Sequence, residues 1–208
     1  MKEGSKMSNT RAQILETKQS TSVKDLCFIA AFAAIICVLS QISIPMPAGV
    51  PMTLQTLIIP LAGIVIGKKR GTYATLLYLL IGAVGLPVFS GFKGGIGVLL
   101  GLTGGFLVSF PVLSLTAGLG DELGIKLSHK SDKTNKIMYY FPIVLCLVIG
   151  ATINYVFGTV WFMIASKTTF LAGLTACVLP FIPTAILKII IVAIVGPELK
   201  KRLSPILN

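Results

Sequence analysis

The sequence predicts an all-α integral membrane protein, a compact bundle of about six transmembrane helices with both the N and the C terminus in the cytoplasm. Of its 208 residues, 54% are hydrophobic and only 12% are charged, whereas a soluble domain carries about 25% charged residues. The hydrophobic residues form long blocks, and about 18 consecutive apolar residues are enough to cross the hydrocarbon core of a bilayer. The basic residues lie almost entirely between these blocks.

Six apolar blocks follow one another along the chain, approximately at residues 26–44, 54–67, 72–87, 97–119, 138–164 and 171–196. The second and third blocks are short for full spans, so we expect these helices to be tilted, broken or buried within the protein. Residues 1–24 are polar and charged and lack the apolar stretch of a signal peptide, which predicts a cytoplasmic lead. We therefore expect a six-helix membrane domain over residues 25–200 and a cytoplasmic tail over 201–208.

The basic residues predict how the bundle is oriented. Of the 18 Lys and Arg residues, 15 lie in the N-terminal lead or in the segments that follow blocks two, four and six. Connections that remain in the cytoplasm are enriched in Lys and Arg. The connections after blocks one, three and five are therefore expected to face outward, which leaves both termini inside. The same segregation explains the net charge of +11 without a nucleic-acid partner.

Two outward connections have an unusual composition. Residues 44–53 contain three prolines, which prevent a helix from continuing, so a rigid, extended loop is expected. Residues 85–95 combine several glycines with Phe89 and Phe92, which allows close backbone approach beside flat apolar surface. We interpret the two segments as the lid of a pocket. Ordinary turn chemistry is the alternative.

Glycines recur at four-residue spacing in two places, and on a helix each set would form a smooth stripe for close packing. The two sets are Gly63, Gly67 and Gly71, and Gly97, Gly101 and Gly105. We interpret both as packing signals, because they predict a compact bundle and say little about a ligand.

The sequence lacks the motifs of the common hydrolases and of ATP-binding proteins. It contains no GxSxG, HExxH or CxxC, and residues 63–69 have neither the spacing nor the Ser/Thr of a phosphate-binding loop. An ATP-driven role would therefore need a partner. The four cysteines lie in apolar blocks and are interpreted as small buried hydrophobic residues. We expect no catalytic residue, no metal site and no resident cofactor.

Lys188 is the one basic residue inside an apolar block. A charge at the middle of a membrane helix costs roughly 2.5–3.5 kcal/mol on insertion scales. Helical side chains lean toward the N terminus of their helix, and block six is expected to run from outside to inside. Lys188 should therefore lean toward the outward loops, although snorkelling to the cytoplasmic surface is the alternative. A cation that reaches into a pocket implies an anionic group on the ligand.

Few other polar side chains occur in the apolar blocks, and amides among them could bind a neutral polar ring. Tyr155, Gly158 and Trp161 share one helical face, where Trp161 is either an interfacial anchor or a pocket wall.

Several segments, in this order and spacing, resemble the biotin-specific substrate-binding subunit of energy-coupling-factor vitamin transporters, the BioY family. The resemblance covers about residues 24–200. It rests on residues 50–57 (VPMTLQTL), 61–63 (LAG), 82–89 (GAVGLPVF), 94–95 (GG), 101–106 (GLTGGF), 155–158 (YVFG) and 182–183 (IP) with Lys188.

The resemblance implies a six-helix subunit of the plasma membrane that binds biotin near its outer face. A shared transmembrane coupling subunit and two cytoplasmic ATPases would then supply the transport power. Ala30 and Ala34 resemble the stripe of small residues that docks the coupling subunit, and common filler is the alternative. The expected substrate-binding residues are Thr53, Gln55, Tyr78, Phe89, Phe92, Lys93, Gly94, Gly95, Thr103, Asn154, Tyr155 and Lys188.

Two positions depart from the family pattern. Ala185 stands where the family usually has an aspartate, three residues before the lysine, and residues 101–105 read GLTGG in place of GPTGG. A sister subunit for another vitamin remains an alternative. So does a membrane enzyme or an assembly factor, although the apolar blocks lack the paired catalytic groups that an enzyme needs.

Overall fold

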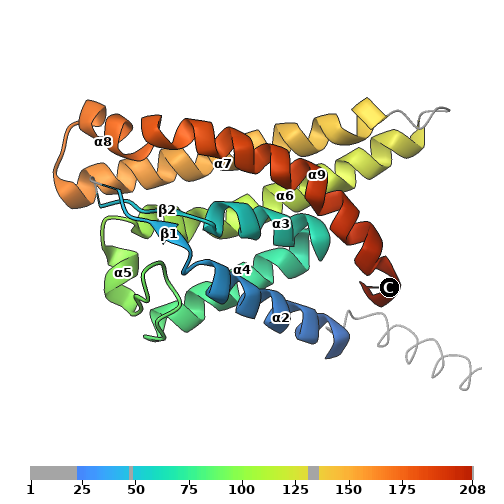
Figure 1. The fold of residues 1–208 in the computed structure, drawn as a ribbon, viewed down its shortest axis with the longest axis horizontal. Helices are drawn as coiled ribbons and strands as arrows, with labels where there is room; N and C mark the ends of the chain where they lie inside the picture. The colour runs from blue at the N-terminus through green and yellow to red at the C-terminus, as the bar shows by residue number, and fades with distance from the viewer. Residues whose placement is uncertain (1–22, 47–48, 131–135, 208) are drawn as a thin grey trace, which may run out of the picture.

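A computed structural model describes residues 23–46, 49–130 and 136–207. The fold is helical, with one very small antiparallel hairpin, and most helices lie along the long axis of the molecule (Figure 1). Residues 1–22 of the expected cytoplasmic lead lie outside the described residues.

The elements follow one another in a simple order. Strands β1 and β2 pair Ser43 with Thr53 and Ile44 with Met52. The elements are α2 (Val23–Leu39), β1 (Ser43–Ile44), β2 (Met52–Thr53), α3 (Gln55–Val65), α4 (Lys68–Ala83), α5 (Ile96–Leu100), α6 (Gly104–Lys130), α7 (Lys136–Ser166), α8 (Phe170–Cys177), the 3₁₀ turn η1 (Leu179–Phe181) and α9 (Ile182–Leu207).

Three helical segments of the described residues are long and apolar enough to cross a membrane: Gly104–Ser128, Lys136–Ser166 and Phe170–Ile206. The other apolar helices are shorter, with 17 residues in α2, 11 in α3 and 16 in α4. Eight of the 11 residues of α3 are buried, so of the three alternatives expected for the second block, tilting, a break or burial within the protein, the structure shows burial. The hairpin lies just before α3 in the chain and beside it in Figure 1.

Two of the expected long blocks are interrupted. The fourth splits into α5 and α6, and Trp161 on α7 stabilises the break by donating its Nε1–H to the carbonyl of Gly101 at 2.9 Å. Trp161 thus stabilises the turn between α5 and α6, a role different from the interfacial anchor or pocket wall considered from the sequence. The sixth block bends at Val178, where α8 gives way to η1 and α9.

The structure confirms close packing in the first glycine stripe and contradicts the second stripe as a helical surface. A Cβ on Gly63 would lie 2.1 Å from the carbonyl oxygen of Ser114, and a Cβ on Gly71 would lie 2.7 Å from the Cα of Gly63. Close packing is therefore confirmed for these two glycines, while Gly67 has a φ of +87° and separates α3 from α4. The second stripe was wrong as a single helical surface, because α5 ends before Gly101 and α6 begins after it.

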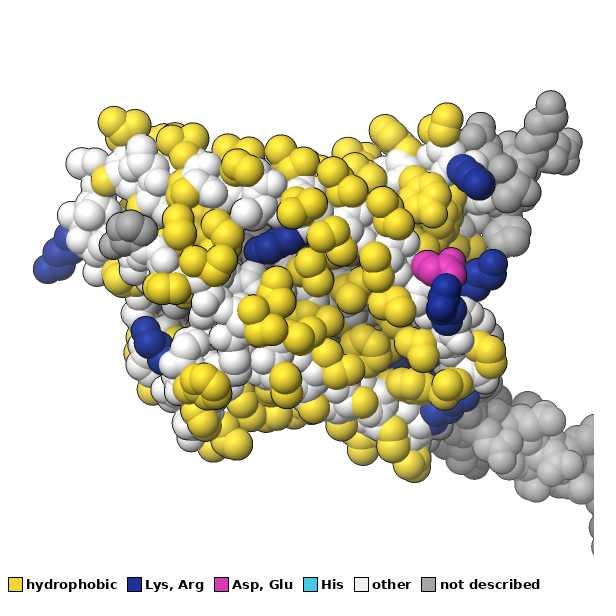
Figure 2. Space-filling view, in the orientation of Figure 1, with side chains coloured by type: hydrophobic (Ala, Val, Ile, Leu, Met, Phe, Trp, Pro, Cys, Tyr) yellow, Lys and Arg dark blue, Asp and Glu magenta, His cyan; other side chains and the backbone are white. Residues whose placement is uncertain are grey.

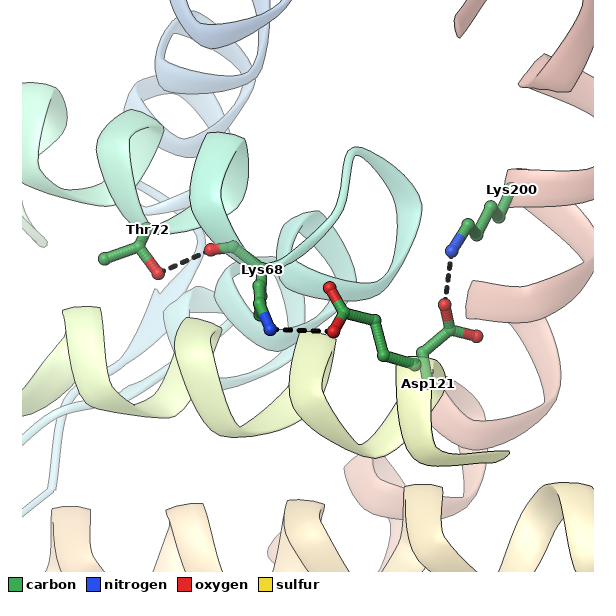
Figure 3. Close-up of polar contacts among 5 residues, drawn as sticks. Lys68, Thr72, Asp121 and Lys200 are labelled. Atoms are coloured by element: carbon green, nitrogen blue, oxygen red, sulfur yellow. Dashed lines mark hydrogen bonds and ion pairs between the residues drawn. The ribbon is translucent and has the colours of Figure 1, made fainter. Parts of the chain in front are cut away.

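Ion pairs gather at one end of the bundle, which we call the charged end. Lys68 Nζ lies 2.7 Å from Glu122 Oε2, and Arg70 pairs with Asp25 at 2.5 Å. Asp121, whose side chain is only 1% exposed, pairs with Lys200 (Figure 3). It also accepts a hydrogen bond from Tyr139 at 2.8 Å. α6 continues past the expected end of block four, so Asp121 lies in the helix instead of in a loop. These contacts join α2, α4, α6, α7 and α9.

The middle of the molecular surface is strongly apolar, and the charged side chains lie mainly toward its ends (Figure 2). Large hydrophobic side chains on α7 are exposed, including Val156 at 56% and Phe157 at 58%. Patches of this kind are rare on soluble monomers and are expected on helices that face lipid. Cys27 is also exposed, so the expectation that all four cysteines are buried was wrong for this residue.

Candidate binding cavity

A cavity of ≈ 350 Å³ lies at the end of the molecule opposite the charged end, within the size range of small-molecule sites. Its walls come from the hairpin, the start of α3, the segment after α4, the α5–α6 break, α7, η1 and α9. None of the described residues that line it is acidic, and only Lys93 and Lys188 are basic. The cavity therefore favours a ligand that carries negative charge.

Lys188 enters the cavity from α9 and contacts only neutral groups. Its Nζ donates to the carbonyl of Thr53 at 2.7 Å and to Oγ1 of Thr56 at 2.9 Å. The side chain thus reaches the hairpin, which is the direction expected from the sequence. An ammonium group has three N–H donors, and no acidic residue among the described ones lies within ion-pair distance of it. One donor and an uncompensated charge are therefore available to a ligand.

Gln55 organises a buried polar cluster beside Lys188. Its Oε1 accepts from the hydroxyl of Thr53 at 2.9 Å, and its Nε2 donates to the hydroxyl of Tyr78 at 2.6 Å. Gln55 is 4% exposed and Tyr78 is fully buried. Buried polar groups are costly unless they are paired, so this chain of bonds fixes how Thr53 and Gln55 present themselves to the cavity.

The opposite wall is formed by α6 and α7. Asn154 uses both of its amide hydrogens on α6, donating to the carbonyl of Phe106 at 3.0 Å and to Oγ of Ser109 at 2.7 Å. Its carbonyl oxygen accepts no hydrogen bond from the described residues. The Phe106 ring contacts Tyr155 edge-on at a centroid distance of 6.5 Å. It fits there because Gly158 has no side chain, as a Cβ at that position would lie 2.1 Å from the ring.

The segment after α4 forms another wall. Phe89 is 1% exposed and packs edge-on against Tyr78 at a centroid distance of 5.5 Å. Backbone bonds between Phe89 and Lys93, at 2.9 and 3.2 Å, close a tight loop. Phe92, at the turn of this loop, has a φ of +57° and is 73% exposed. It is therefore turned away from the cavity.

Eight of the twelve residues expected from the sequence line the cavity: Thr53, Gln55, Phe89, Lys93, Thr103, Asn154, Tyr155 and Lys188. The other four do not. Tyr78 lies behind Gln55, and Phe92 faces outward. Gly94 and Gly95 shape the loop, since a Cβ on Gly94 would lie 2.3 Å from the Leu86 carbonyl oxygen and Gly95 has a φ of +92°.

Sequence reasoning missed several lining residues, including Thr56, Ser90, Phe106 and Phe181. Thr56 directly follows Gln55 in the chain, and Phe106 ends the GLTGGF segment, so both carried a usable signal. Phe181 lies at the helix break before α9, which hydropathy does not reveal.

Similarity to proteins of one family extends along nearly the whole chain. The BioY family profile matches residues 10–205. The biotin transporter BioY2 of Lactococcus lactis subsp. cremoris is 37% identical over 186 residues, which is 89% of this chain and 95% of that protein. A probable biotin transporter BioY of Pyrococcus horikoshii is 35% identical over 179 residues, or 85% of this chain and 96% of that protein.

The fold has a counterpart among solved structures. A crystal structure of the S-component for biotin from an ECF-type ABC transporter superposes with a TM-score of 0.73 and 27% sequence identity. The match covers 89% of this chain and 95% of that one. Sequence and fold therefore agree over the same span, and the chain belongs to the BioY family.

Proposed function

We propose that this multi-pass membrane protein binds biotin in the cavity and acts as the S-component, the substrate-binding subunit, of an ECF-type transporter. Relatives that share 35–37% identity with it are named as biotin transporters. The observation that carries the proposal is the chemistry of the cavity, which is closed by apolar and neutral polar groups around the uncompensated charge of Lys188.

The parts of biotin correspond to the parts of the cavity. Biotin has a neutral ureido ring with donors and an acceptor, an apolar chain and a carboxylate. The free carbonyl oxygen of Asn154 can accept from a ring N–H, and the hydroxyl of Thr103 can donate or accept. Phe89, Phe106 and Tyr155 offer apolar faces. Charge favours the biotin carboxylate as the partner of Lys188, since an unpaired charge in a poorly hydrated cavity is costly.

The proposed topology has six spans with both termini in the cytoplasm. The charged end supports it, because Lys68 and Arg70, from the first turn of α4, lie there together with Lys200, from the C-terminal part of α9. The cavity would then face outward, where a substrate arrives. Labelling of single cysteines in intact cells should reach positions at Gly49 and Lys167 from outside but should not reach Lys69. The reverse pattern would contradict this topology.

Transport by an S-component requires a coupling subunit and two ATPases, and we propose that α2 provides the docking surface. Ala30 and Ala34 are both exposed, which supports close approach of another helix. Ala30→Trp or Ala34→Trp should prevent assembly with the coupling subunit and leave biotin binding intact. Co-purification that survives both changes would refute the docking surface.

Binding measurements on the purified protein test the proposed ligand. Biotin should bind far more tightly than any other member of a vitamin panel, and a different preferred vitamin would replace the proposal with a sister specificity. Lys188→Met should weaken biotin binding by at least about tenfold, equivalent to about 1.4 kcal/mol. The same change should have a much smaller effect on biotin amide. Equal losses for both ligands would mean that Lys188 binds a neutral group and that the carboxylate is held elsewhere.

A further inference from the structure

The loop of residues 86–93, which brings Phe89 and Lys93 to the cavity, is held by Ser40 and Gln41, the two residues that directly follow α2. Ser40 Oγ donates to the carbonyl of Val88 at 2.5 Å, and Gln41 Nε2 donates to the carbonyl of Pro87 at 3.3 Å. In return, Gln41 Oε1 accepts the backbone N–H of Phe92 at 2.8 Å. Two consecutive side chains therefore bind backbone groups on both sides of the turn.

The loop cannot satisfy these groups by itself. Its internal backbone bonds join Phe89 with Lys93 and run from Val88 N–H to the carbonyl of Leu86. The carbonyls of Pro87 and Val88 and the N–H of Phe92 have no backbone partner among the described residues. A peptide group left unpaired away from water is costly, and this applies to the Val88 carbonyl, because its partner Ser40 is fully buried. The two Gln41 contacts are exposed and add hydrogen bonds on the outer side of the loop. Ser40 and Gln41 therefore contribute to the stability of this loop conformation.

The loop position determines the shape of the cavity wall. The Phe89 ring sits over Gly82, where a Cβ would come within 2.2 Å of the ring, and against Tyr78, which also bonds Gln55. A displaced loop would withdraw Phe89 and Lys93 together. Neither Ser40 nor Gln41 lines the cavity, so these two residues act on the cavity wall through the loop.

We infer that Ser40 and Gln41 are positioning residues that hold the loop of residues 86–93 against the cavity and thereby set how long the ligand stays bound. The inference rests on the proposed function, with biotin as the ligand. Loss of the Ser40 and Gln41 contacts lets the loop lift and opens an exit without changing any side chain that touches the ligand. The signature is faster dissociation together with faster amide exchange confined to the loop.

The variants are Ser40→Ala, Gln41→Met and the double variant of the full chain in detergent. Hydrogen exchange of the loop is measured without ligand, and dissociation of radiolabelled biotin is measured separately. Each single change should speed both processes about fivefold, the effect of losing about 1 kcal/mol, and the double variant should exceed tenfold. Gln41→Glu keeps an oxygen that can accept from Phe92 N–H, so the exchange of that amide should return close to the parent rate.

Ser204→Ala is the matched control, because its hydroxyl donates to the carbonyl of Lys201 at the charged end, 2.8 Å away. It should change neither rate. Unchanged loop exchange in Gln41→Met overturns the inference, as does faster exchange throughout α7, which indicates general destabilisation. Unchanged biotin dissociation from a loosened loop also overturns it. A parent protein that binds no biotin refutes the proposed function instead, and the exchange data then decide alone whether Ser40 and Gln41 hold the loop.

Discussion

The two ends of the helix bundle differ in the partners that they provide for charged side chains. At the charged end, Asp121 is buried and has a basic partner, Lys200 (Figure 3), and a hydroxyl donor, Tyr139. At the cavity end, Lys188 has only the neutral oxygens of Thr53 and Thr56. A buried charge with its partners in place joins helices. A charge without a counter-ion remains uncompensated until one binds, and we expect the ligand to be the counter-ion of Lys188 in the cavity.

The backbones of the two ends differ in the same sense. At the charged end, α4, α6, α7 and α9 are continuous helices tied by ion pairs. The cavity end is built from a hairpin, a loop and two helix breaks. Regular helices satisfy their own peptide groups, whereas breaks and loops leave groups that need side-chain partners. We therefore expect substitutions at the charged end to affect stability and those at the cavity end to affect binding.

Asp121→Asn should produce the largest effect. It removes the anion between Lys200 and Tyr139, and hydrogen bonds to a charged group contribute about 1.5–3 kcal/mol. The free energy of unfolding in mixed SDS micelles should fall by about 2–3 kcal/mol, while biotin affinity of the folded protein stays within about threefold of the parent. A large loss of biotin affinity at unchanged stability would contradict the expectation that the charged end determines stability and the cavity end determines binding.

Lys188→Met should show the opposite balance. Methionine fills similar space without a charge, and replacement of a poorly compensated, partly buried charge by an apolar residue should be close to neutral, as it often is for buried ion pairs. The free energy of unfolding without biotin should change by less than about 1 kcal/mol, although the affinity for biotin falls at least about tenfold. The same micelle titration, with and without saturating biotin, measures both effects. A destabilisation as large as that of Asp121→Asn would make Lys188 a structural residue.

Hydropathy predicted the helical class and most element positions, because burial in lipid demands long apolar helices. It could not locate the breaks at Gly101 and Val178. These depend on tertiary contacts such as the bond from Trp161 to the Gly101 carbonyl, which no local pattern encodes. The short, enclosed α3 was expected because block two was too short to span.

The sequence indicated cavity-lining residues best where a residue type has few roles in an apolar block. Lys188, Asn154 and Gln55 line the cavity and fall in this class, because a charge or an amide in an apolar block needs specific partners. Phe92 belongs to the same loop as Phe89, but the chain turns between the two residues. Phe89 is buried and Phe92 is exposed, and composition alone cannot predict which aromatic ring faces inward. The contacts of Ser40 and Gln41 could not be predicted from the sequence either, because their partners lie more than 45 residues away along the chain.

Lys93→Met tests whether the cavity end has one cationic position or two. Lys93 is exposed, so solvent and salt screen its charge, and its main contribution should be attraction of anionic biotin to the cavity mouth. The association rate should fall about two- to threefold at low salt, and the difference should vanish at high salt. Stopped-flow measurements over a salt series provide the rates. A loss of tenfold or more that is absent for biotin amide would move the carboxylate from Lys188 to Lys93.

The smallest effect is expected for Glu198→Gln, which asks whether every ion pair at the charged end matters or only the buried ones. Glu198 and Arg202 form an i, i+4 pair at 3.0 Å on α9, and their side chains are 56% and 74% exposed. Exposed helical pairs of this kind contribute about 0.3–0.5 kcal/mol. Unfolding in mixed micelles should therefore change by no more than about 0.5 kcal/mol, well below the loss for Asp121→Asn. Because both residues lie on the same helix, the pair ties no second element to α9. An effect comparable to that of Asp121→Asn would mean that the number of charges, and not their burial between helices, stabilises this end of the protein.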